Sequence, residues 1–155
     1  MDSATTYLIV KKGTTSKRLF LFIGDASVTT GAGLTGLTSA SAGLVAYRAR
    51  EDDGNAAATV ITLAAATRGT WSSGGFVEKD ASNMPGWYEV GLPAATLATG
   101  SNIAVVHLKG ATNMRPTAIH IQLVDYDPND GLRLGLTALP NATAGANGGL
   151  PALDA

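Results

Sequence analysis

Short apolar runs separated by turn residues recur along the chain and predict β-strands rather than helices. The clearest case is 117–126, TAIHIQLVDY, where Ile119, Ile121 and Leu123 share one face and His120 and its alternate neighbours share the other. Further strands are expected at 6–12, 17–24, around 34–37, and at 44–51, 57–64, 69–80, 87–92 and 102–110. Roughly seven to nine strands at this spacing predict an all-β, antiparallel β-sandwich, either Ig-like or jelly-roll.

The segment 17–24, KRLFLFIG, is apolar on both faces of its predicted strand. Leu19, Leu21 and Ile23 point one way, and Phe20 and Phe22 point the other. A strand of this kind is covered on both sides. We therefore expect a second sheet or a neighbouring subunit over each face.

Turn residues mark the connections between these strands. Asp-Gly in 52–55, DDGN, and Pro-Gly in 83–86, NMPG, predict turns, because glycine adopts the positive φ that tight turns require. The Gly-Gly pair inside 69–80 predicts a bulge. The segment 93–100, PAATLATG, is typical of one helical turn that begins with proline and ends at glycine.

The chain ends with a segment that fits neither a strand nor a helix. From Leu134 to Leu153 it carries no charge and contains five leucines, with glycines and prolines between them. We therefore divide the chain into a β-sandwich domain, 1–126, and an extended, irregular C-terminal arm, 127–155. The arm is expected to contact other subunits through its leucines, which are Leu134, Leu136, Leu139, Leu150 and Leu153.

Composition narrows the classes of partner. The net charge is −1 and 15 % of residues are charged, so the surface lacks the basic patch that nucleic-acid binding needs. No cysteine is present, which excludes disulfides and Cys-based zinc sites. The first residues do not read as a signal peptide, and no apolar run reaches the ~18 residues of a membrane span. We expect no membrane partner and no secretion.

Candidate catalytic and metal-binding residues are few. Acidic residues at 51–53 and at Glu78 and Asp80 fall where predicted strands end, and solvated hairpin tips explain them better than a catalytic pair. His107 and His120 lie in predicted strands, and two histidines do not supply the three or four converging ligands of a metal site. We predict no catalytic, cofactor-binding or metal-binding residue.

The segment 125–131, DYDPNDG, places Asp125, Asp127 and Asn129 at alternate positions, as in a calcium-binding EF-hand loop. Its glycine comes one place late, and Leu136 stands where that loop has a bidentate glutamate. A turn that ends the strand is expected instead.

Three aromatic residues are candidates for stacking on a sugar ring: Trp71, Trp87 and Tyr88. Trp87 and Tyr88 are neighbours in a predicted strand, so they face opposite sides. One of the two is therefore expected in the core and the other on the surface.

Two segments, 72–100, SSGGFVEKDASNMPGWYEVGLPAATLATG, and 105–130, VVHLKGATNMRPTAIHIQLVDYDPND, resemble uncharacterised structural proteins encoded by tailed bacteriophages. In that group a β-domain of this size carries a strand with Pro-Gly, an aromatic residue and Tyr, then a short Leu-Pro turn, and a last strand Ile-x-Leu-Val. The join RLGLTALPNATAGANGGLP, 133–151, resembles the segment that follows this domain. The resemblance covers the chain from about residue 8 onward.

The resemblance implies a non-enzymatic virion component, often the N-terminal domain of a fibre or baseplate-associated protein. In longer members the join leads into a further shaft or tip, whereas this sequence stops at Ala155. It is either a short member of the group or the base of a longer fibre. The group defines no functional residues, so none is carried over.

Three functional hypotheses follow, and an enzyme ranks below them all. The first is a tail fibre, or an adaptor between fibre and baseplate, that assembles as a homotrimer and contacts neighbouring virion proteins. The second is a capsid decoration or head-fibre protein whose arm lies over a neighbouring subunit. The third is a carbohydrate-binding module that uses Trp71, Trp87 or Tyr88 on a host-surface glycan. The first two place the protein in the virion, assembled in the host cytoplasm.

Overall fold

The computed structural model describes residues 6–130, which form nine β-strands and two short 3-10 turns. The strands are β1 (Thr6–Lys11), β2 (Arg18–Phe22), β3 (Val45–Arg50), β4 (Thr59–Ile61), β5 (Ala64–Ala65), β6 (Gly75–Asp80), β7 (Met84–Gly91), β8 (Ile103–Lys109) and β9 (Thr117–Val124). The 3-10 turns are η1 (Glu51–Asp53) and η2 (Ala94–Thr96). The all-β prediction is confirmed.

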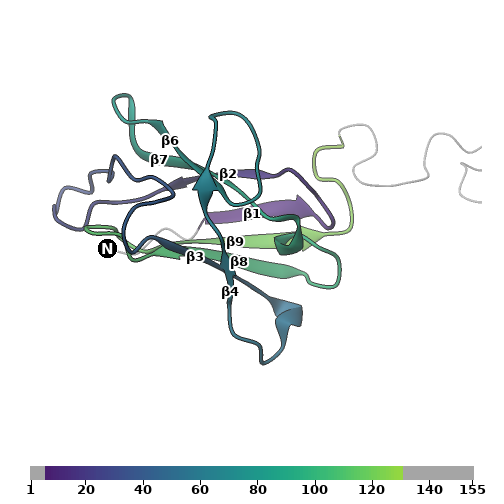
Figure 1. The fold of residues 1–155 in the computed structure, drawn as a ribbon. Coiled ribbons are helices and arrows are strands. Elements are labelled where there is room, and N and C mark those ends of the chain that lie inside the picture. Colours follow the sequence, from purple (N-terminus) through teal and green to yellow (C-terminus); the bar gives the residue numbers. More distant parts are fainter. Residues whose placement is uncertain (1–5, 131–155) are drawn as a thin grey trace, which may run out of the picture.

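The strands form two sheets, which lie as two layers in Figure 1. The five-stranded sheet has the order β1-β9-β8-β3-β4, and the four-stranded sheet has the order β2-β7-β6-β5. One cluster of buried side chains draws on both sheets, with Ala46, Val106 and Ile121 from the first and Leu21 and Tyr88 from the second. The two sheets therefore share a single hydrophobic core, in which each large apolar side chain contributes about 1.5–3 kcal/mol.

Both sheets are mixed, because each contains one parallel pair. β1 runs parallel to β9, from Thr6 beside Ile119 to Lys11 beside Val124, and β5 runs parallel to β6. The other pairs are antiparallel. The prediction of a purely antiparallel arrangement is wrong here. β1 and β9 are far apart in sequence, so the turn signals that identify hairpins say nothing about their pairing.

The segment 57–64, expected as one strand, serves both sheets instead. β4 pairs with β3 in the five-stranded sheet, and β5 pairs with β6 in the four-stranded sheet. Gly74 fixes the point at which the chain passes from one sheet to the other. The backbone of Gly74 packs against the carbonyl of Thr62, and the carbonyl of Gly74 accepts a hydrogen bond from the N–H of Ala64 at 2.9 Å. The crossing of β4 toward the second sheet is visible in Figure 1.

Three other boundaries differ from the prediction. Residues 34–37 form no strand; the N–H of Leu37 and the carbonyl of Leu34 bond to the hydroxyl of Tyr88 instead. β6 begins only at Gly75, and its register irregularity lies between Glu78 and Asp80 rather than at the Gly-Gly pair. Residues 84–86, expected as a turn, belong to β7 and follow a turn at 81–83.

The remaining strand predictions agree with β1, β2, β3, β8 and β9, and the helical turn at 93–100 contains η2. β9 ends at Val124, shortly before the proposed domain boundary at residue 126. The division into a domain and an arm stays a prediction, because the arm from residue 131 onward lies outside the described residues.

Candidate functional site

The five leucines proposed for the subunit interface all lie outside the described residues.

The three aromatic candidates for sugar stacking lie within the described residues. Tyr88 is fully buried and its ring stacks on Phe76 with centroids 4.9 Å apart, so Tyr88 is removed from the side chains on which a sugar could stack. Trp71 is half-buried, and its indole N–H donates to the carbonyl of Leu92 at 3.1 Å. Trp87 points to the outer face, as the alternation along β7 predicts.

An aromatic surface lies on the outer face of the four-stranded sheet, at its β2 edge. Phe20 and Phe22 point away from the core and are 47 % and 38 % exposed. Phe22 stands opposite Trp87 in the register, and their ring centroids are 5.8 Å apart. The core covers the face of β2 that carries Leu19, Leu21 and Ile23, and cover of the other face by a neighbouring subunit stays a prediction. The phenylalanine face remains open, and exposed aromatic clusters of this kind mark interaction sites.

A groove of about 440 Å³ runs beside these aromatic rings, between β2 and the start of β9. Its walls are mostly apolar and include Phe20, Phe22, Trp87, Pro116 and Ala118. The groove thus combines parts of both sheets at the side where β2 is the edge strand.

The polar side chains of the groove are already engaged. Arg115 donates from Nε to the carbonyl of Asp25 at 3.1 Å and from Nη2 to the carbonyl of Val28 at 2.9 Å. The hydroxyl of Thr117 donates to the carbonyl of Phe22 at 3.0 Å. A sugar needs several convergent polar partners, so this groove suits an apolar occupant better.

β2 also offers main-chain hydrogen-bonding groups along its open edge. The N–H of Ile23 donates to the carbonyl of Gly86, and the carbonyl of Lys17 accepts from the N–H of Leu92. The main-chain N–H and C=O groups of the odd-numbered residues of this strand therefore point toward β7. In an antiparallel pair the alternate residues direct their N–H and C=O groups away from the partner. Arg18, Phe20 and Phe22 therefore direct theirs away from β7, as an edge strand does, and the carbonyl of Phe22 is already bonded to Thr117.

A buried carboxylate stands next to the aromatic surface. Glu89 is only 2 % exposed, and it accepts hydrogen bonds from Arg18 at 2.5 Å, from Lys79 at 2.9 Å and from the N–H of Gly69 at 2.9 Å. Burial by itself raises the pKa of Glu89, but these three partners outweigh it and lower the pKa to about 2. Lys79 also lies over the ring of Phe20, 5.6 Å from its centroid. The carboxylate stays charged and ties the loop around Gly69 to the outer face.

The sequence carried a signal for this cluster that the prediction missed. Glu89 is a single acidic residue inside the apolar strand segment WYEVGL, 87–92. A charged residue in such a position is either fully exposed or paired. Its partners Arg18, Lys79 and Gly69 come from three separate segments, so their convergence could not be read from the chain.

The outer face of the five-stranded sheet is a second apolar surface. Tyr7, Ile9 and Ile103 are exposed on it, Tyr7 to 74 %. Tyr7 stands beside His120, with ring centroids 5.5 Å apart, and Gln122 stands between Ile9 and Ile103. A hollow of about 390 Å³ lies among these side chains. Both outer faces of the domain thus carry large apolar side chains.

The histidines and carboxylates form no metal site among residues 6–130. His107 and His120 are half-buried on the same outer face, but no group of three or more His, Asp or Glu is placed to hold a metal ion in the described part of the chain. Asp125 pairs with Lys12 at 3.1 Å, and Asp127 accepts from the N–H of Asn129 at 2.9 Å, as in a strand-ending turn. At the tip after β3, Asp53 accepts from the N–H of Arg50 at 2.7 Å.

Within residues 6–130 no helix has the length and apolar character needed to cross a bilayer. Comparisons with models of protein families, with curated proteins and with solved structures found no match to this chain.

Proposed function

We propose that this protein is a structural component of a tailed-bacteriophage virion and acts by assembly rather than catalysis. Its place is the tail, as a fibre protein or as an adaptor between fibre and baseplate. The single observation that carries the proposal is the presence of large apolar side chains on both outer faces, Tyr7, Ile9 and Ile103 on one and Phe20 and Phe22 on the other. A lone domain buries such side chains in one core, whereas a subunit between neighbours needs two contact faces.

The sequence resemblance to phage structural proteins supports the same class. Low surface charge supports it too, because 15 % charged residues leave more of the surface suited to contact with other subunits. A capsid decoration or head-fibre protein is the alternative location. It shares the two contact faces and differs only in the neighbours.

For the fold type we propose an Ig-like sandwich rather than a jelly-roll. An Ig domain of the variable type has nine strands in two sheets, with C, F and G adjacent in one sheet and B, E and D adjacent in the other. The order β9-β8-β3-β4 corresponds to G-F-C-C′, and the order β2-β7-β6 corresponds to B-E-D. A jelly-roll divides eight strands differently.

Carbohydrate binding ranks below assembly. Tyr88 lies in the core and the indole N–H of Trp71 is bonded to Leu92. Only Trp87 remains beside an open groove, and the polar groups around it are engaged within the chain.

Electron microscopy of particles from a phage that encodes this chain, with the protein marked by a specific antibody fragment, tests the proposal. Added density on the tail is the expected result. Density on the capsid would favour the alternative, and particles that lack the protein would overturn both.

Oligomeric state gives an independent test with the full-length chain. We expect a trimer by light scattering, and we expect Ile103→Asp to dissociate it, because a carboxylate would be buried in an apolar contact. Thr112→Asp changes an exposed residue in the turn after β8 and serves as the control. A wild-type chain that stays monomeric at high concentration would contradict assembly through its own faces.

A further inference from the structure

We propose that the groove beside β2 binds residues 134–139, LGLTAL, of a second copy of this chain, which add to β2 as an extra strand. The inference deepens the proposed function by naming the partner segment and its site, and it rests on that function. It is carried by three observations: an open strand edge, an apolar groove beside it, and an uncharged leucine segment that the same chain supplies.

The open edge provides the hydrogen bonds. Phe20 lies in the middle of β2, and its N–H and C=O face outward from the four-stranded sheet. An extended segment that pairs with such an edge gains main-chain hydrogen bonds whatever its side chains are. The carbonyl of Phe22 already accepts from Thr117, which marks where the added strand must end.

The groove provides the side-chain pocket. In an added strand, Leu134 and Leu136 share one face and Gly135 and Thr137 share the other. The groove holds about 440 Å³ along Phe20, Phe22 and Ala118, which is room for leucine side chains. Because Arg115 and Thr117 use their polar atoms internally, an uncharged apolar segment matches this lining.

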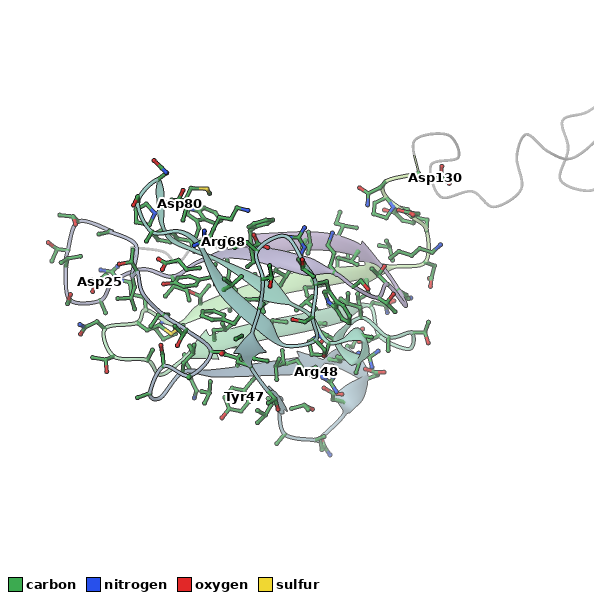
Figure 2. All side chains as sticks on the ribbon, turned by 45° about the horizontal axis from the view of Figure 1, so that its top comes forward. Asp25, Tyr47, Arg48, Arg68, Asp80 and Asp130 are labelled. Carbon is green, nitrogen blue, oxygen red and sulfur yellow. The ribbon has the colours of Figure 1, made fainter. Side chains whose placement is uncertain are left out.

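The reach of the chain decides which copy supplies the segment. Asp130 lies at the opposite end of the molecule from Asp25, whose carbonyl is bonded to Arg115 of the groove (Figure 2). β9 runs from Thr117 at the groove to Val124, and seven residue steps of a strand span about 23 Å. Leu134 is four residues beyond Asp130 and reaches at most about 14 Å. Leu134 therefore does not reach the groove of its own chain, and we assign the strand that places Leu134 there to a neighbouring copy.

Cysteine cross-linking tests this directly, because the natural chain contains no cysteine. Full-length Ala118→Cys chains are mixed with full-length Leu136→Cys chains and oxidised gently. Ala118 lines the groove, so a disulfide-linked dimer of the two variants is expected, at a yield at least tenfold above the background. The background comes from Leu136→Cys mixed with Ala57→Cys, an exposed residue before β4 at the other edge of the five-stranded sheet.

Each other occupant gives its own pattern. A monomeric disulfide in the Ala118→Cys, Leu136→Cys double variant, without linkage in the mixture, would show a segment of the same chain in the groove. Linkage of Ala118→Cys to Ser3→Cys would assign the groove to residues 1–5, and linkage of Ala118→Cys to itself would assign it to a second β-domain. Each of these results, or a mixture at background level, overturns the inference.

The two proposals fail separately. Cross-linking at background level in a protein that electron microscopy finds on the particle removes the strand addition and leaves the virion function. Specific cross-linking in a protein absent from particles removes the virion function and leaves self-assembly through β2.

Discussion

Gly43 and Gly110 lie so close together that the carbonyl oxygen of each occupies the space where a side chain on the other would stand. Both have positive φ, 77° and 96°. They flank the pair of Val45 with Lys109, the first pair between β3 and β8. Two glycines thus allow the segments at this end of the five-stranded sheet to pack backbone on backbone.

Replacing Gly110 by alanine should lower the free energy of unfolding by about 2–4 kcal/mol, because a Cβ there meets the carbonyl of Gly43 and the positive φ adds strain. Chemical denaturation measures the loss. Gly31 has a similar φ of 79° but no neighbour within 4 Å, so Gly31→Ala should cost only about 1 kcal/mol. Equal losses in the two variants would contradict the close packing.

Glu89 should make the fold sensitive to acid. Its pKa is lowered from 4.5 to about 2 in the folded state, so its contribution is complete above about pH 4.5 and is lost as the pH falls toward 2. Glu89→Gln should cost about 2–3 kcal/mol at neutral pH and flatten the decline between pH 4.5 and 2, as measured by denaturation at each pH. Asp125→Asn breaks an exposed ion pair and should cost less than about 1 kcal/mol. An unchanged acid profile in Glu89→Gln would refute this assignment.

Tyr88 should make the fold sensitive to base. Burial raises its pKa to about 12, so the folded state keeps the proton that the unfolded chain releases near 10. Stability is therefore complete below about pH 10 and falls as the pH rises toward 12. Tyr88→Phe should lower the free energy of unfolding by about 1–2 kcal/mol at neutral pH, because it removes the hydrogen bonds of the hydroxyl to the carbonyl of Leu34 and from the N–H of Leu37. Tyr126→Phe, at an exposed tyrosine, should leave the free energy of unfolding at neutral pH unchanged.

Phe22 should matter more for assembly than for folding. It is 38 % exposed, so Phe22→Ser should lower the free energy of unfolding by only about 1 kcal/mol. The proposed oligomer should nevertheless dissociate at a concentration at least tenfold higher, because one wall of the groove is lost. Met84 is about as exposed, at the tip between β6 and β7, and Met84→Ser is the matched control for sedimentation measurements. Equal effects of the two changes would argue against the groove as a contact.

The strands that the sequence predicts best are those with local signals. Alternation along 117–126 identified β9 and placed Ile119 and Ile121 in the core. The prediction of a strand at 34–37 is wrong, because Leu34 and Leu37 are held by hydrogen bonds to the hydroxyl of Tyr88, more than fifty residues away in sequence. Local periodicity cannot report such a partner.

The candidate site was predictable only in part. The two-sided apolar pattern of β2 pointed to a contact on the face of Phe20 and Phe22, and that face is open in the single chain. The groove beside it needs β9 to lie next to the edge of β2, which is a property of the topology. The charged cluster on Glu89 likewise needs the loop at Gly69 to fold over the sheet.

The parallel pairing of β1 with β9 has a mechanical consequence. Force applied between the entry of β1 and the exit of β9 acts along the strands, because these points lie at opposite ends of the pair. All the hydrogen bonds from Thr6 to Lys11 would then be loaded together in shear, rather than opened one after another as in a zipper. A domain pulled by these two ends therefore resists force more strongly than one whose terminal strands separate bond by bond.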